Sequence, residues 1–172
     1  AMNALQEAWL TLTEGQFLDM SFERRLGVTP DDYFRMIGGK TGALLAVAPE
    51  IGALVAGAAQ DKCALYRRYG AALGRAFQLQ DDILGIWGDE AATGKSAASD
   101  ILSKKKTLPV IYALAHEAVG ADLAALYAGP GFTPADVPAV TALLDAAGTR
   151  AYTEAHAQAA MADACAALAA VG

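Results

Sequence analysis

The chain has 172 residues, enough for one domain with a substantial core. Its formal net charge of −6 and pI near 4.8 exclude the overall basic field of a typical nucleic-acid-binding protein and fit a cytoplasmic one. Hydrophobic residues make up 55% of the chain, and alanine, the best helix former, contributes much of the excess. The composition therefore favours close-packed helices.

Neither the chain start nor its apolar runs predict a membrane or export signal. No run of about 18 apolar residues is free of charges and helix breakers, as a membrane span requires. Ala1-Met2-Asn3 lacks the basic and apolar regions of a signal peptide and could be the scar of a cleaved tag. Cys63 and Cys165 have no metal-ligand spacing, so we expect small buried hydrophobes in a reducing compartment.

Apolar spacing and helix start signals predict an all-α protein. The helices are expected over residues 5–22, 30–46, 49–59, 61–86, 107–119, 121–127, 134–146 and 149–171. Two of them begin with a threonine cap followed by proline, at Thr29-Pro30 and Thr133-Pro134. Residues 87–106 hold lysines and glycines without an apolar period, so we expect a loop there.

The long helix over residues 61–86 carries one face with few side chains. Seven residues share this face: Gly70, Ala71, Gly74, Gln78, Asp81, Asp82 and Gly85. Glycine inside a helix costs roughly 0.5–1 kcal/mol relative to alanine, so the glycines need a reason. Either another backbone packs closely on this face, or it borders a cavity with metal ligands. We favour the cavity because the carboxylates share the face.

Asp81 and Asp82 are adjacent carboxylates, which repel each other unless a cation neutralises them. Mg²⁺ binds in this way, through one or two carboxylates, phosphate oxygens and waters. Separated lysines follow, in TGK (93–95) and KKKTLP (104–109). An aspartate pair alone is usually a solvated helix end, but this combination predicts a divalent metal with a phosphorylated ligand.

The same segments carry a specific resemblance. FQLQDDILGIWGD, TGKSAASD and KKKTLPVIYAL resemble the second aspartate-rich region of trans-isoprenyl diphosphate synthases, the polyprenyl synthetase family. Upstream, EGQFLDM (14–20) and MIGGKTGALL (36–45) resemble the family's GQ and KTG segments. The resemblance covers roughly residues 5–115 and is nearest to geranylgeranyl and farnesyl diphosphate synthases.

The resemblance implies an isoprenoid-synthase-type helical bundle and a transferase reaction. Mg²⁺ would assist ionisation of an allylic diphosphate, whose carbocation adds to isopentenyl diphosphate before a proton is lost. Metal ions and lysines would stabilise the charge that develops on pyrophosphate. Asp81 would be the direct Mg²⁺ ligand, Asp82 would hold metal-bound water, and Gln78 would orient the cluster.

The resemblance also implies a substrate site. Its substrate-binding residues would be Gln16, Asp19, Lys40, Lys95 and Lys105. Lys40 and Lys95 would contact the allylic diphosphate, and Thr41 would sit beside Lys40 at the cavity wall. These three, with Gln78, form the predicted catalytic set. Lys105 is assigned less specifically because two further lysines adjoin it.

Two departures from the family pattern stand out. Gly85 replaces the third aspartate of DDxxD, and Asp89 could substitute only by bending off the helix. The first aspartate-rich motif and the basic residues for isopentenyl diphosphate are absent. Residues 1–172 therefore resemble the C-terminal portion of a single polyprenyl synthetase domain.

Three explanations of this half-length match are open: a truncated or proteolysed protein, one piece of a split enzyme, or a free-standing module without catalysis. Alone, the chain is expected not to turn over and to expose apolar faces. We therefore expect a homodimer or association with the missing N-terminal half.

Two rival functions use a related fold, a non-catalytic regulatory subunit or scaffold and a class I terpene cyclase. The KTG lysine and the GK loop favour the prenyltransferase over the cyclase. Retention of Asp81, Asp82, Lys40 and Lys95 together argues against a scaffold. His116 and His156 are predicted to be ordinary surface or helix-end histidines.

Overall fold

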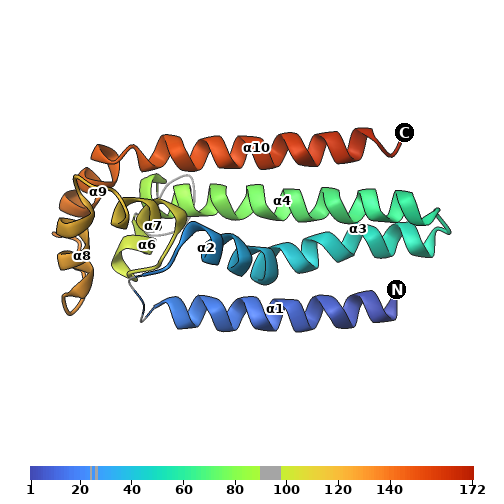
Figure 1. Ribbon diagram of the computed structural model, residues 1–172, viewed down its shortest axis with the longest axis horizontal. Coiled ribbons are helices and arrows are strands. Elements are labelled where there is room, and N and C mark those ends of the chain that lie inside the picture. The colour runs from blue at the N-terminus through green and yellow to red at the C-terminus, as the bar shows by residue number, and fades with distance from the viewer. Residues whose placement is uncertain (24, 26, 90–97) are drawn as a thin grey trace. The chain divides into compact units, whose positions relative to one another are not determined.

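The computed structural model describes residues 1–23, 25, 27–89 and 98–172. Over these residues the chain forms helices, turns and loops without a strand (Figure 1), which confirms the predicted all-α class. The helices are α1 (Met2–Phe22), α2 (Pro30–Ile37), the π-helical turn η1 (Gly38–Gly42), α3 (Ala43–Val55), α4 (Gln60–Trp87), α6 (Ser99–Leu102), α7 (Leu108–Leu114), α8 (Gly120–Ala128), α9 (Val137–Ala146) and α10 (Thr149–Ala169). None of the helices in these ranges is long and apolar enough to cross a membrane.

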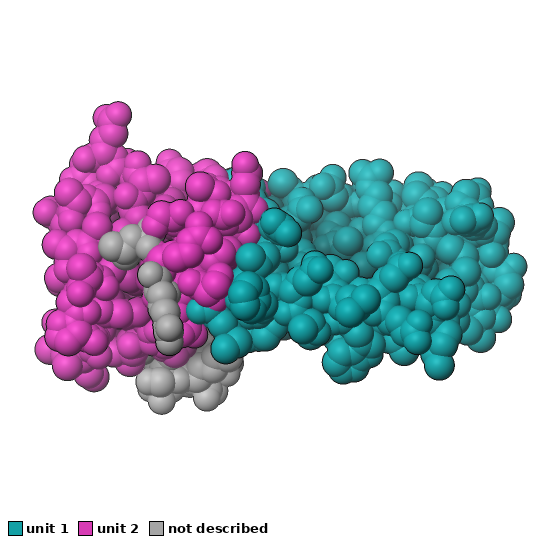
Figure 2. Space-filling view, turned by 60° about the horizontal axis from the view of Figure 1, so that its bottom comes forward, with its two compact units in different colours: residues 1–20, 34–78, 156–172 teal, residues 21–33, 79–155 magenta. Residues whose placement is uncertain are grey.

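The chain divides into two compact units, coloured separately in Figure 2. Unit 1 contains residues 1–20, 34–78 and 156–172, and unit 2 contains residues 21–33 and 79–155. Helices α1, α2, α4 and α10 each contribute residues to both units. The long helix α4 was predicted over residues 61–86 and spans Gln60–Trp87, so its 4-3 apolar spacing located it within one residue at each end.

In unit 1, the bare face of α4 packs against backbone. A Cβ built at Gly70 would lie 2.7 Å from the Leu45 carbonyl carbon and 2.8 Å from the Ala46 Cα. At Gly74 it would lie 3.0 Å from the Gly42 Cα. These glycines therefore let α3 and η1 approach α4 closely, and the interpretation of this stretch as a cavity wall is wrong.

Helix α3 runs through Pro49, so the prediction of a new helix starting there is wrong. Proline has no N–H to donate to the carbonyl four residues earlier, which belongs to Leu45. The Leu45 carbonyl is the group that faces Gly70 of α4. The backbone of Gly70 therefore packs against the Leu45 carbonyl, which receives no hydrogen bond from Pro49, and α3 continues through the proline.

Unit 2 is built around one apolar core. Its buried members come from the end of α4 and from the segments that follow, and they are Ile86, Ala98, Ile101, Val110, Ala113, Val119, Leu123, Tyr127, Val140, Leu144 and Ala147. Burial of these side chains removes apolar surface from water, which stabilises the unit. The segment that carries the lysines is therefore anchored at Ala98, Ile101 and Val110.

The two predicted helix starts behave differently. At α2, the Asp32 N–H donates to the Thr29 hydroxyl and the Thr29 N–H donates to the Asp32 carboxylate, both at 3.1 Å, which confirms the predicted cap. The second start is three residues late, because α9 begins at Val137. A helix starting at Pro134 would require an N–H from Pro138, which has none.

Candidate functional site

In unit 1, Lys40 of η1 forms an ion pair with Asp19 of α1. Two glycines bring these elements together. A Cβ at Gly15 would lie 2.7 Å from the Gly39 carbonyl carbon, and a Cβ at Gly39 would lie 2.7 Å from the Thr11 carbonyl oxygen. The missing side chains let η1 rest on α1, which places the Lys40 ammonium beside the Asp19 carboxylate.

The neighbouring Thr41 hydroxyl donates to Oε1 of Gln78 on α4 at 2.8 Å. Both side chains are partly buried, as is Lys40. Gln16 on α1 is exposed. Unit 1 thus gathers Asp19 with Lys40 and Thr41 with Gln78, four of the residues predicted for the site.

In unit 2, the Asp82 carboxylate is the centre of a buried polar network, with only 1% of the residue exposed. The Tyr33 hydroxyl donates to its Oδ2 at 2.6 Å, and the Leu108 N–H donates to the same oxygen at 3.2 Å. Lys105 Nζ lies 3.6 Å from Oδ1. The Leu108 amide is the first of α7, one of the helical N–H groups without an intrahelical partner. Asp82 therefore ties α2, α7 and the lysine segment to α4.

The environment fixes the protonation of the groups around Asp82. Burial, and then the Asp82 charge, raise the pKa of the Tyr33 hydroxyl well above its ordinary value, so it stays a donor. Burial by itself would lower the pKa of the Lys105 ammonium. The carboxylates of Asp82 and Asp100 outweigh that effect, and the pKa of Lys105 is raised. The network thus holds a positive charge against carboxylates near neutral pH.

The three consecutive lysines have different partners. Lys104 donates to the carbonyls of Tyr127 and Gly129, which close α8. Lys106 is buried, with Nζ 4.7 Å from the centre of the Tyr127 ring. Lys105 is the lysine of the three that pairs with carboxylates in the described part of the chain. The predicted place of Lys105 near the diphosphates stays a prediction.

The adjacent aspartates are not equivalent, since Asp81 is partly exposed whereas Asp82 is buried. Among the described residues, no three His, Cys, Asp or Glu side chains form a ready-made metal-binding group. The predicted Lys95 lies outside the described residues.

Two contacting residues were missed from the sequence. Tyr33 belongs to no segment with a recognised motif, and its contact with Asp82 spans 49 positions. Asp100 pairs with Lys105 at 3.3 Å. It ends the TGKSAASD segment, so a signal for Asp100 was present.

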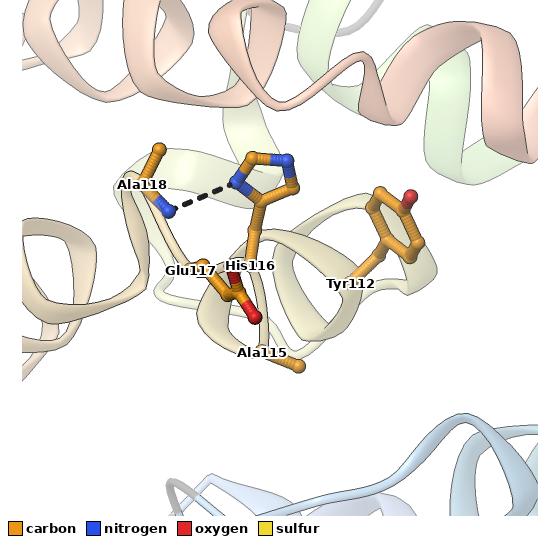
Figure 3. Close-up of a pocket in the computed structure, with 5 residues that line it drawn as sticks. All are labelled: Tyr112, Ala115, His116, Glu117 and Ala118. Atoms are coloured by element: carbon orange, nitrogen blue, oxygen red, sulfur yellow. Dashed lines mark hydrogen bonds between the residues drawn. The ribbon is translucent and has the colours of Figure 1, made fainter.

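A cavity of about 420 Å³ lies elsewhere in unit 2 and is shown in Figure 3. Its described lining residues are Tyr112, Ala115, His116, Glu117 and Ala118. None of these was predicted for the site. His116 accepts the Ala118 N–H through Nδ1 at 3.3 Å, just past the end of α7. His156 packs its ring 5.3 Å from that of Phe34. The partners in these two contacts, Ala118 and Phe34, are not residues predicted for the site.

Comparison with known proteins adds family evidence. The Polyprenyl synthetase family profile matches residues 1–144. A geranylgeranyl diphosphate synthase from Mycobacterium tuberculosis is 46% identical over 150 residues, which are 86% of this chain and 43% of that protein. The chain thus spans about half the length of the curated relatives it matches, such as this one.

Solved structures agree. The crystal structure of a polyprenyl synthetase from Streptomyces coelicolor A3(2) matches with a TM-score of 0.94 and 40% identity, over 99% of this chain and 53% of that chain. A polyprenyl synthase from Caulobacter crescentus CB15, complexed with calcium and isoprenyl diphosphate, matches with a TM-score of 0.89 and 32% identity, over 98% and 52% of the two chains. The predicted resemblance and fold type are confirmed.

Proposed function

Because the chain belongs to the polyprenyl synthetase family, we propose that it provides the second aspartate-rich region of a trans-prenyltransferase site of the geranylgeranyl or farnesyl class. In this reaction the C–O bond of an allylic diphosphate breaks and pyrophosphate leaves. A C–C bond then forms to isopentenyl diphosphate, and a proton is lost from the new chain. Residues 1–172 would form the C-terminal portion of a single synthetase domain.

The observation that carries the proposal is the Asp82 network. It places the Lys105 ammonium 3.6 Å from Asp82 Oδ1. The neighbouring residue on the same helix, Asp81, is partly exposed. Carboxylates and a lysine together suit a diphosphate that arrives with a divalent cation.

The two aspartates would divide the work at the cation. Asp81 would be the direct Mg²⁺ ligand, because both carboxylate oxygens of Asp82 already have protein partners. Asp82 would hold metal-bound water, and Gln78 would orient the cluster. Magnesium, when bound, supplies positive charge that stabilises pyrophosphate as a leaving group. The polyprenyl synthase from Caulobacter crescentus, whose structure is complexed with calcium and isoprenyl diphosphate, supports the use of a divalent cation.

The diphosphate of the allylic substrate would bind Lys40 and Lys95, with Lys105 near the pyrophosphate. Since Lys40 pairs with Asp19, an anionic ligand must share or displace that carboxylate. Thr41 and Gln78 would hold the η1 turn and α4 in place through their hydrogen bond. Gln16 and Asp19 would line the site from α1.

A partner is supported by large apolar side chains on α1 that are 56–71% exposed: Met2, Trp9, Leu10, Phe17 and Met20. We infer that this face associates with another polypeptide, either a second copy or one resembling the other half of the longer relatives. Without such a partner the chain is expected not to turn over. The cytoplasmic location also stays a prediction.

Calorimetry tests the proposal with inorganic pyrophosphate and Mg²⁺. Wild-type chain is expected to bind pyrophosphate about tenfold more tightly with Mg²⁺, and Asp81→Asn should remove that gain by deleting the ligand charge. Asp122→Asn, an exposed aspartate in unit 2, is the matched control and should bind like the wild type. Binding that ignores Mg²⁺, or that survives Asp81→Asn unchanged, would contradict the assignment.

A product assay separates the rivals. With allylic and isopentenyl diphosphates, a longer prenyl diphosphate supports the transferase and shows that no partner is needed. A cyclic hydrocarbon from the allylic diphosphate alone supports the terpene cyclase. Failure to bind pyrophosphate, with the fold intact, favours the scaffold.

A further inference from the structure

In unit 2, the Asp100 carboxylate occupies the space that a side chain at Gly85 would fill. A Cβ built at Gly85 would lie 2.5 Å from the Asp100 Cγ and 3.0 Å from its Oδ1. Real Cβ atoms essentially never approach a heavy atom as closely as 2.5 Å, so a side chain at 85 would displace this carboxylate. Position 85 is where the DDxxD pattern has its third aspartate, and here Asp100, fifteen residues later, fills that space.

Asp100 uses this place to hold Lys105. Its Oδ2 lies 3.3 Å from Lys105 Nζ, which is also 3.6 Å from Asp82 Oδ1. The Asp100 side chain is 14% exposed and that of Lys105 is 28% exposed. The Lys105 N–H also donates to the Asp100 carbonyl at 3.0 Å. Both the backbone and the side chain of Asp100 therefore restrain Lys105.

The backbone around this pair is held in costly conformations. Ala98 and Lys104 have φ values of 56° and 54°, in the left-handed region that disfavours residues with a Cβ. They flank the short helix α6 that presents Asp100, and Lys104 directly precedes Lys105. Such conformations persist when surrounding contacts fix them, here the Lys104 bonds to α8 and the buried Ala98.

We propose that Gly85 and Asp100 form a positioning device that fixes Lys105 against Asp82. The glycine provides the space, and the Asp100 carboxylate occupies it and pairs with the lysine. Asp100 is a positioning residue that acts through Lys105. The use of this restraint in diphosphate binding rests on the function proposed above.

The test measures how fast an amine-reactive reagent acetylates Lys105, followed by peptide mass spectrometry at one fixed pH. Exposed Lys62 in unit 1 serves as the internal reference. Asp100→Asn, which keeps the side-chain volume, and Asp100→Ala should each raise Lys105 labelling about fivefold relative to Lys62, the factor expected for a partly exposed ion pair. Unchanged labelling in both variants would overturn the proposal.

The Gly85→Ala variant tests whether the space at position 85 is needed for Asp100 to hold Lys105. It should raise Lys105 labelling in the wild-type background by pushing Asp100 away, and should add nothing in the Asp100→Ala background. Gly52→Ala is the matched control, because a Cβ at this helical glycine meets nothing within 4 Å. An equal effect of Gly85→Ala in both backgrounds would show that it does not act through Asp100, against the proposal.

Pyrophosphate calorimetry of the same variants keeps the two ideas apart. If Asp100→Asn raises Lys105 labelling and weakens Mg²⁺-dependent pyrophosphate binding, both stand. If labelling rises while the affinity stays at the wild-type value, the positioning device stands and the role of Lys105 in the proposed function fails. Circular dichroism of each variant verifies that the helices remain.

Discussion

Replacing Tyr33 by phenylalanine tests whether Asp82 is a structural anchor of unit 2. The change deletes a hydroxyl that donates to Asp82 Oδ2 at 2.6 Å and keeps the buried ring. Asp82 retains the Leu108 amide and Lys105 but loses one of the donors to its buried carboxylate. A hydrogen bond to a charged group contributes about 1.5–3 kcal/mol to stability. For a protein of this size, that loss corresponds to a Tm lowered by roughly 3–12 °C.

Tyr127→Phe is the matched control for this measurement. Tyr127 is also a buried tyrosine of unit 2, but its hydroxyl has no hydrogen-bond partner among the described residues. Deleting an unsatisfied buried hydroxyl should leave stability unchanged or raise it. Thermal unfolding followed by circular dichroism compares the two variants. Equal losses at Tyr33 and Tyr127 would show that the Asp82 contact contributes nothing and would refute the reasoning.

Two further predictions follow from local geometry. Gly70→Ala should destabilise unit 1, because its Cβ would lie 2.7 Å from the Leu45 carbonyl carbon, whereas Gly52→Ala in open space should stabilise by about 0.5–1 kcal/mol; thermal unfolding of both compares them. Hydrogen bonds from the Thr133 N–H and hydroxyl lower the pKa of Asp136, so its contribution to stability is present above the unfolded value near 3.8 and is lost as pH falls through the folded value. The stability difference between wild type and Asp136→Asn should therefore shrink in acid titrations below that range, and a constant difference would contradict the sign.

Local signals in the sequence were enough for most of the helices, and motif resemblance named residues that the structure brings into contact with one another. The 4-3 spacing of apolar residues located α4, and the cap at Thr29 located the start of α2. Motif resemblance selected Lys40 and Asp82, both of which the structure places in polar contacts. The spacing, the cap and the motifs are each formed by residues within a few positions of one another, which a sequence pattern records.

Other features depend on contacts between distant segments. The helix through Pro49 needs the bare backbone of Gly70, which no local rule around Pro49 contains. Asp82 is buried and accepts a hydrogen bond from Tyr33 of another helix, whereas Asp81 is partly exposed. Helix propensity and apolar spacing contain no information about contacts between distant segments, so these contacts could not be predicted from the sequence pattern.

The π-helical turn Gly38–Gly42 bears on which changes of chain length the segment would tolerate. A π turn contains one residue more than an α turn, since its bonds run from i to i+5. Deleting a single residue there would restore α-helical winding and shift the residues that remain in the turn, Lys40 among them, relative to α1. Lys40 would then swing away from Asp19, even though a side chain at Gly38 would meet nothing within 4 Å. The turn is therefore expected to accept a substitution at Gly38 more readily than the loss of any one of its five residues.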